Sequence, residues 1–136
     1  MGTLRHRFTV SDRLHDERTT AHVHVYATRA HLHAAAHAFN GNAHDDDTRA
    51  VTQAYANSDD TWVLPIVRVH LDDDGSVPLE VLVHEMHHAS AAIYGTLPHS
   101  LAEPLTHYNE PFAYLHSNLV MGAAHQLRRR GIGLSM

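Results

Sequence analysis

The residues with the clearest chemical potential lie in stretch 82–89, where His84 is followed by Glu85 and, four positions after His84, by His88. On an α-helix, residues four apart lie on the same face, so His84 and His88 could direct two imidazole nitrogens at one cation. Glu85 lies beside this pair, where its carboxylate could accept a proton from a water molecule held at such an ion. The spacing therefore predicts a metal site on a helix.

The setting of this motif supports a real site, although 16 histidines among 136 residues raise the chance of a coincidental match. Apolar residues around the motif recur with the spacing of a buried helix face: Leu79, Leu82, Val83, Met86, Ala89 and Ile93. Two imidazoles and a carboxylate beside such a stripe would be costly to bury without a partner. The role of His87 is ambiguous, and we expect its side chain either to point toward solvent or to contact the metal ligands without binding the metal.

The amino-acid composition limits the possible classes of protein and the residue types that could bind a metal. A chain of 136 residues, 43% of them hydrophobic, suits one domain covering residues 1–136. The chain has no cysteine, which excludes disulfides and thiolate ligands, so zinc would need nitrogen and oxygen ligands. No secretory signal or membrane-length apolar run is present, which predicts a cytoplasmic protein without a membrane partner. The formal net charge of −5 argues against nucleic-acid binding.

Hydrophobic periodicity predicts an α+β fold with a small sheet of three to four strands. The predicted strands cover residues 4–10, 21–27 and 62–71, residues 49–56 form a strand or a helix, and residues 11–20 form a loop. The predicted helices run from a Thr28 cap to about Asn40, from Ser76 or Val77 to just before Gly95, and from Glu110 to about Arg130. Pro65 suggests that the 62–71 strand lies at the sheet edge, or that this proline is near the start of the strand.

The two histidines need a further ligand, because a catalytic zinc site takes three protein ligands and one water. The Gly-x-x-His extension that some zinc enzymes carry after this motif is absent, since Ala91 and Tyr94 occupy those places. The remaining candidates are Glu110, His107, His99, Glu103 and His116. We favour Glu110 because a helix–loop–helix hairpin would return the first turn of the last helix to the metal.

A family resemblance adds to this interpretation. His84-Glu85-x-x-His88, followed 22 residues later by Glu110-Pro111-Phe112-Ala113-Tyr114, resembles the gluzincin pattern of HExxH with a downstream Glu-x-x-Ala segment. In compactness the chain is similar to minimal zincin metallopeptidases, including the ImmA/IrrE group and small HExxH proteins of bacteria and phages. The resemblance covers roughly residues 63–119.

The resemblance implies a minimal zincin-like fold, in which an edge strand lies beside the motif helix. It implies His84, His88 and Glu110 as zinc ligands and Glu85 as general base. It also implies that residues 66–71 form the sheet edge along which an extended peptide lies.

The predicted function is a zinc-dependent metallopeptidase that acts on a peptide or protein substrate. Tyr114 is the first candidate for stabilising the transition state, followed by Tyr108 and His107. One alternative is a non-catalytic zinc-binding structural or regulatory module, including one of phage origin. Another is an adaptor whose histidines bind metal only adventitiously.

Overall fold

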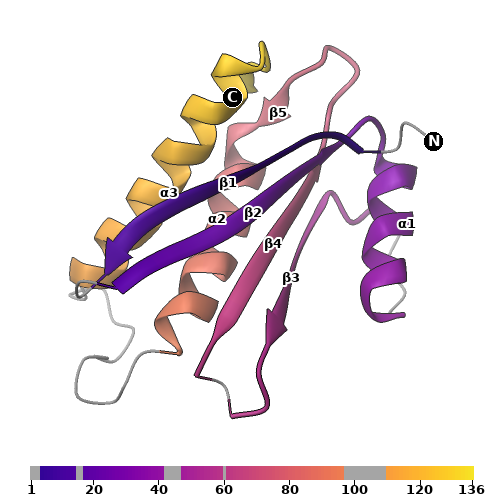
Figure 1. Ribbon diagram of the computed structural model, residues 1–136. Coiled ribbons are helices and arrows are strands. Elements are labelled where there is room, and N and C mark those ends of the chain that lie inside the picture. The colour runs from indigo at the N-terminus through magenta and orange to yellow at the C-terminus, as the bar shows by residue number, and fades with distance from the viewer. Residues whose placement is uncertain (1–3, 15–16, 42–46, 60, 97–109) are drawn as a thin grey trace.

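The computed structural model describes residues 4–14, 17–41, 47–59, 61–96 and 110–136, which contain both strands and helices (Figure 1). In chain order they are β1 (Leu4–Leu14), β2 (Glu17–Tyr26), α1 (Arg29–Asn40), β3 (Ala50–Ala56), β4 (Val63–His70), β5 (Val77–Pro78), α2 (Leu79–Tyr94), α3 (Glu110–Arg129) and β6 (Leu134–Ser135). The predicted α+β class is confirmed.

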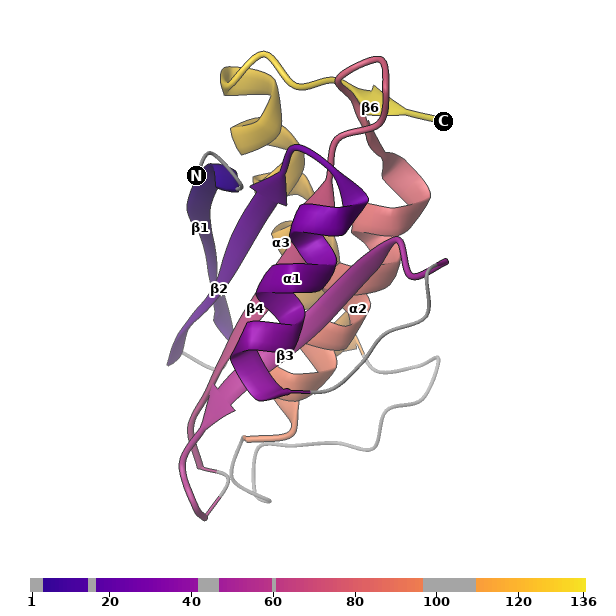
Figure 2. The same ribbon diagram turned by 90° about the vertical axis from the view of Figure 1, so that its right-hand side faces the viewer.

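The helices cover both faces of one mixed sheet. Its strand order is β1-β2-β4-β3, with β2 and β4 parallel and the other neighbours antiparallel. Helix α1 lies on one face, and α2 and α3 lie side by side on the other (Figures 1 and 2). A second, two-stranded sheet pairs β5 with β6 and so attaches the end of the chain to the start of α2.

The predicted edge strand is wrong, because β4 lies between β2 and β3. The edge strand beside α2 is instead β3, the segment whose pattern left strand and helix open. Five successive residues of β4, from Pro65 to Val69, are buried, as expected for a strand covered on both faces. Pro65 lies near the start of β4 rather than in an edge strand, and pairing with β2 begins one residue later, at Ile66.

The predicted loop at residues 11–20 is also wrong, because residues 11–14 belong to β1 and residues 17–20 to β2, and the two strands pair. The antiparallel pairing continues from Val10 opposite Ala21 to Leu14 opposite Glu17. The stretch is polar in sequence because its outward-facing side chains carry hydroxyls. The side-chain oxygens of Ser11 and Thr20 lie 3.1 Å apart across the two strands. The buried face of β1 packs against α3.

The ends of α1 agree with the sequence prediction. The Thr28 hydroxyl accepts a hydrogen bond from the backbone N–H of His31 at 3.2 Å, which caps the first turn. Gly41 ends the helix at φ 76°, a left-handed conformation that glycine adopts without steric cost. Helix α2 begins at Leu79, later than predicted, because residues Val77 and Pro78 pair with β6.

The core lies between the sheet and the helix pair α2–α3. Helix α2 buries Leu82, Met86 and Ala89 completely, which confirms the apolar stripe expected around the motif. Helix α3 contributes the buried residues Leu115, Leu119, Ala123 and Leu127. Because this stripe faces the sheet, the opposite side of α2, which carries the motif histidines, is turned toward solvent.

The other face of the sheet holds a buried polar cluster under α1. Arg68 is 6% exposed and donates from Nε to Gln53 Oε1 at 2.7 Å and from Nη1 to Tyr26 Oη at 2.6 Å. Its Nη1 also lies 3.3 Å from Nδ1 of His24. The alternating pattern of residues 21–27 predicts that His22 and His24, on one strand face with Tyr26, are solvated. This prediction is wrong for the end of the strand, since Tyr26 is buried and His24 is half-buried.

This cluster predicts a loss of stability in mild acid. Burial, followed by the charge of Arg68 and then the charges of His22 and Arg7, lowers the pKa of His24 from 6.5 to about 4. In that window the unfolded chain takes up a proton and the folded chain does not, so stability is complete above pH 6.5 and falls as the pH drops toward 4. The loss is at most about 3 kcal/mol for this partly exposed group.

Urea unfolding at pH 7 and pH 4.5 measures this contribution. The wild-type protein should lose more unfolding free energy between the two pH values than His24→Gln, whose side chain stays neutral throughout. An equal loss in both proteins would mean that the pKa of His24 is ordinary in the folded state.

Candidate metal centre

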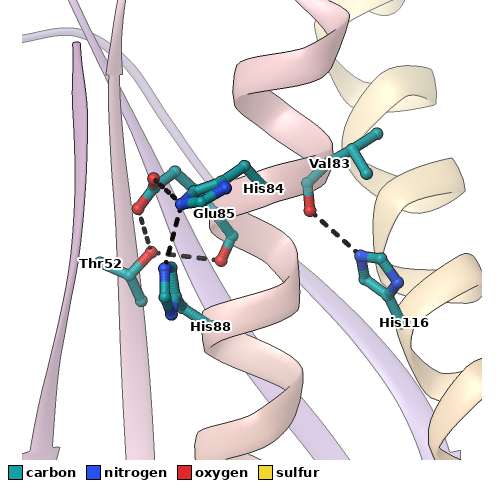
Figure 3. A network of polar contacts seen from close by, with 6 residues as sticks. All are labelled: Thr52, Val83, His84, Glu85, His88 and His116. Carbon is teal, nitrogen blue, oxygen red and sulfur yellow. Dashed lines mark hydrogen bonds and ion pairs between the residues drawn. The ribbon is translucent and has the colours of Figure 1, made fainter.

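Helix α2 brings the three motif residues together on its solvent side, next to the edge strand β3 (Figure 3). His84 and His88 are exposed, whereas Glu85 is 7% exposed and lies against β3. This arrangement follows from helix geometry, because the buried stripe turns His84 and His88 outward one turn apart and places Glu85 about 100° round the axis. The sequence prediction that these residues form one cluster is confirmed.

The two imidazoles converge on a common point. Their Nε2 atoms lie 3.2 Å apart. Two nitrogens on a tetrahedral zinc ion, each at about 2.0–2.1 Å, would be about 3.3 Å apart. One ligand atom from each of His84, Glu85 and His88 can be chosen so that all three lie within 4.8 Å of one another. Two nitrogens and a carboxylate oxygen gathered in this way could hold a metal ion.

The Glu85 carboxylate is held from the neighbouring strand. Thr52 of β3 donates its hydroxyl to Glu85 Oε1 at 2.8 Å, and the same Oγ1 lies 3.2 Å from the backbone oxygen of Glu85 (Figure 3). The second carboxylate oxygen, Oε2, lies 3.9 Å from His84 Nε2. Sequence reasoning missed Thr52, because nothing in its local pattern connects it with a residue 33 positions further on.

The cluster lies along a groove between β3 and α2 that holds two adjoining cavities. One has a volume of about 480 Å³ and is lined by Asp47, Thr48, Arg49, Ala50, Glu80, Val81, His84 and Glu85. The other has a volume of about 430 Å³ and is lined by Thr48, Ala50, Val51, Thr52, Gln53, Ala54, His84, Glu85, His88 and Ala92. Both cavities include His84 and Glu85, so the motif lies where the two meet.

His87 and His116 contact each other on the α3 side of α2, and the His87 ring also lies 6.2 Å from the ring of His88. The ring centroids of His87 and His116 are 5.6 Å apart, and His87 also lies 5.4 Å from the ring of Phe112. The Nε2 atom of His116 is 3.1 Å from the backbone oxygen of Val83 (Figure 3). Partial burial, and then the charge of His116, lowers the pKa of His87. His116 therefore lies on the side of α2 away from the paired imidazoles.

Glu110 is the first residue of α3 and is exposed. Helix α3 runs antiparallel to α2, as the hairpin prediction requires, with Phe112 against Tyr94 and His116 against Val83. Across the described residues, the close-packed ligand group contains His84, Glu85 and His88 but not Glu110. Glu110 as third ligand therefore stays a prediction.

The remaining predicted residues divide between exposed and undescribed positions. His99, Glu103, His107 and Tyr108 lie outside the described residues. Tyr114 lies on α3 with 65% of its surface exposed, and its role in stabilising a transition state stays a prediction.

Comparison of the chain with known protein families, with curated proteins and with solved structures found no match. Among the described helices, none is both long and apolar enough to cross a membrane. The fold and the site together define an α+β protein with a candidate metal centre on α2.

Proposed function

We propose that this protein is a zinc-dependent peptidase of the minimal zincin kind. The observation that carries the proposal is the 3.2 Å convergence of the two Nε2 atoms of His84 and His88, beside the carboxylate of Glu85. A structural zinc site without cysteine can use the same ligand types, but it has no need of an additional carboxylate facing a groove. The arrangement supplies two of the three protein ligands and the general base that metal-assisted hydrolysis uses, which supports the proposal.

In this proposal the residues have separate roles. A bound zinc ion supplies a Lewis acid that polarises the substrate carbonyl and lowers the pKa of water toward about 7. His84 and His88 hold the ion, with Glu110 as the proposed third ligand. Glu85 accepts a proton from the attacking water and then passes it to the leaving amine. Tyr114 is the proposed hydrogen-bond donor to the transition state.

The groove supports an extended peptide as substrate. Among the described strands, β3 pairs with β4 alone, so its other side offers backbone N–H and C=O groups to a further strand. Beyond the motif at one end, the groove carries Asp47 and the Arg49–Glu80 ion pair at 3.1 Å. At the other end it is lined by the small side chains of Ala54 and Ala92. We therefore expect polar residues on one side of the scissile bond and compact apolar residues on the other.

Incubation with a diverse peptide library, followed by mass spectrometry, tests the proposal. Protein loaded with one equivalent of zinc should cleave a subset of peptides, lose this activity on chelation, and regain it when zinc is returned. Stoichiometric zinc binding without cleavage, together with melting on chelation, would contradict the peptidase and support a non-catalytic zinc module. Failure to retain zinc would support adventitious binding.

A further inference from the structure

We infer that Thr52 is a positioning residue that orients the Glu85 carboxylate, so that Oε2 rather than Oε1 is the oxygen that accepts the proton. The inference deepens the proposed peptidase and rests on it. It assigns a role at the site to the edge strand β3, in addition to any backbone pairing with substrate.

The hydrogen-bond geometry selects one carboxylate oxygen. A threonine hydroxyl has a single proton to donate. Of its two acceptors on Glu85, the carboxylate Oε1 is nearer, at 2.8 Å, than the backbone oxygen, at 3.2 Å. A hydrogen bond to a charged acceptor is also the stronger one. The hydroxyl of Thr52 therefore engages Oε1 and leaves Oε2 free.

The free oxygen faces the paired imidazoles. Glu85 Oε2 lies 3.9 Å from His84 Nε2. Glu85 is 7% exposed, so a carboxylate rotated away from Thr52 would leave one buried oxygen without a donor. The hydrogen bond therefore restricts the carboxylate to the rotamer in which Oε2 faces the Nε2 atom of His84.

The support for this contact is rigid. Thr52 lies within β3 and pairs with Val67 of the central strand β4, where Val67 is fully buried. Its branched Cβ restricts rotation about χ1, so the hydroxyl is held in direction as well as in position. Strand β3 is also the strand with which the substrate is proposed to pair. A bound peptide would therefore lie along the strand that carries Thr52, the residue that orients Glu85.

Three variants test the role in the zinc-loaded enzyme. Thr52→Val keeps the shape and removes the hydroxyl, and we expect kcat to fall about 10- to 100-fold, as is typical when a residue supporting a metal-site group is lost. The change in KM and in zinc affinity should be much smaller. Thr52→Ser restores the donor and should recover most of kcat. Thr9→Val makes the same exchange at an exposed position of β1 and should leave kcat unchanged.

A second measurement on metal-free protein keeps this inference separable from the peptidase proposal. Thr52→Val should lower the melting temperature by about 5 °C, because it leaves a buried carboxylate oxygen without its donor. The same substitution should have little effect when Glu85→Met has already removed the carboxylate. Equal effects in both backgrounds would show that the contact is absent and overturn the inference.

The kcat and melting measurements distinguish failure of the inference from failure of the peptidase proposal. If wild-type protein cleaves no peptide but the melting coupling is present, the peptidase proposal falls, the proton-transfer role falls with it, and the contact itself stands. If the enzyme is active and Thr52→Val retains full kcat, the positioning role is wrong and the peptidase proposal is untouched. Loss of kcat that Thr52→Ser fails to recover would also overturn the role.

Discussion

Replacing Glu85 with glutamine is expected to remove most of the peptide hydrolysis while leaving zinc bound. Glutamine has the length of glutamate, and its side-chain oxygen can still accept the hydrogen bond from Thr52, but the amide cannot take up a proton. General acid–base catalysis typically contributes about 10²- to 10⁴-fold, so we expect kcat to fall by that range. Steady-state kinetics and metal analysis of the same preparation measure both quantities.

Glu17→Gln is the matched control for this substitution. Glu17 is the exposed first residue of β2 and lines neither cavity of the groove. The same chemical change there should alter kcat little, since substitutions at exposed positions away from the site change stability by only about 0.5 kcal/mol. Full activity of Glu85→Gln would remove Glu85 from the general-base role. Loss of zinc from this variant would indicate that Glu85 is itself a ligand.

The second large effect is expected for zinc affinity when a ligand is removed. His84→Ala or His88→Ala deletes one of two converging nitrogens, so the dissociation constant for zinc should rise by at least about 100-fold, more than the loss typical of supporting residues. His87→Ala is the matched control, because this exposed histidine contacts Phe112 and His116 on the other side of α2. Competition with a chromophoric chelator measures all three. Equal losses for His87→Ala and His88→Ala would contradict the site.

The same titration identifies the third ligand. Glu110→Gln should weaken zinc binding nearly as much as His88→Ala, whereas His116→Ala should have a small effect because its ring faces the Val83 backbone oxygen on the α3 side. The opposite result would assign the third ligand to His116. No effect from either substitution would leave His99, Glu103 and His107 as the candidates.

Several features could be predicted from the sequence because they depend on neighbours along the chain. The His-Glu-x-x-His spacing places His84 and His88 on one helix face whatever surrounds it, and the apolar stripe through Leu82 and Met86 turns that face outward. The cap at Thr28 and the left-handed Gly41 likewise follow from local hydrogen bonding and backbone sterics.

Other features depended on residues far apart in the chain. The alternating pattern of apolar and polar residues in β4 predicts a strand. It does not show that β3 pairs with β4 on the side away from β2, so the sequence prediction of the sheet edge was wrong. The outward-facing residues of the β1–β2 hairpin are polar, so their local sequence cannot be told from that of a loop. Arg68 is buried because α1, a separate element, covers it.

The sequence alone determined the pair of imidazoles and the adjacent carboxylate, because helix periodicity is a local property. Only the tertiary structure decided which strand lies beside them and which hydroxyl, that of Thr52, holds Glu85. Strand order, and contacts between residues 33 positions apart in the sequence, are set by packing of the whole chain. They therefore cannot be predicted from a short stretch of sequence.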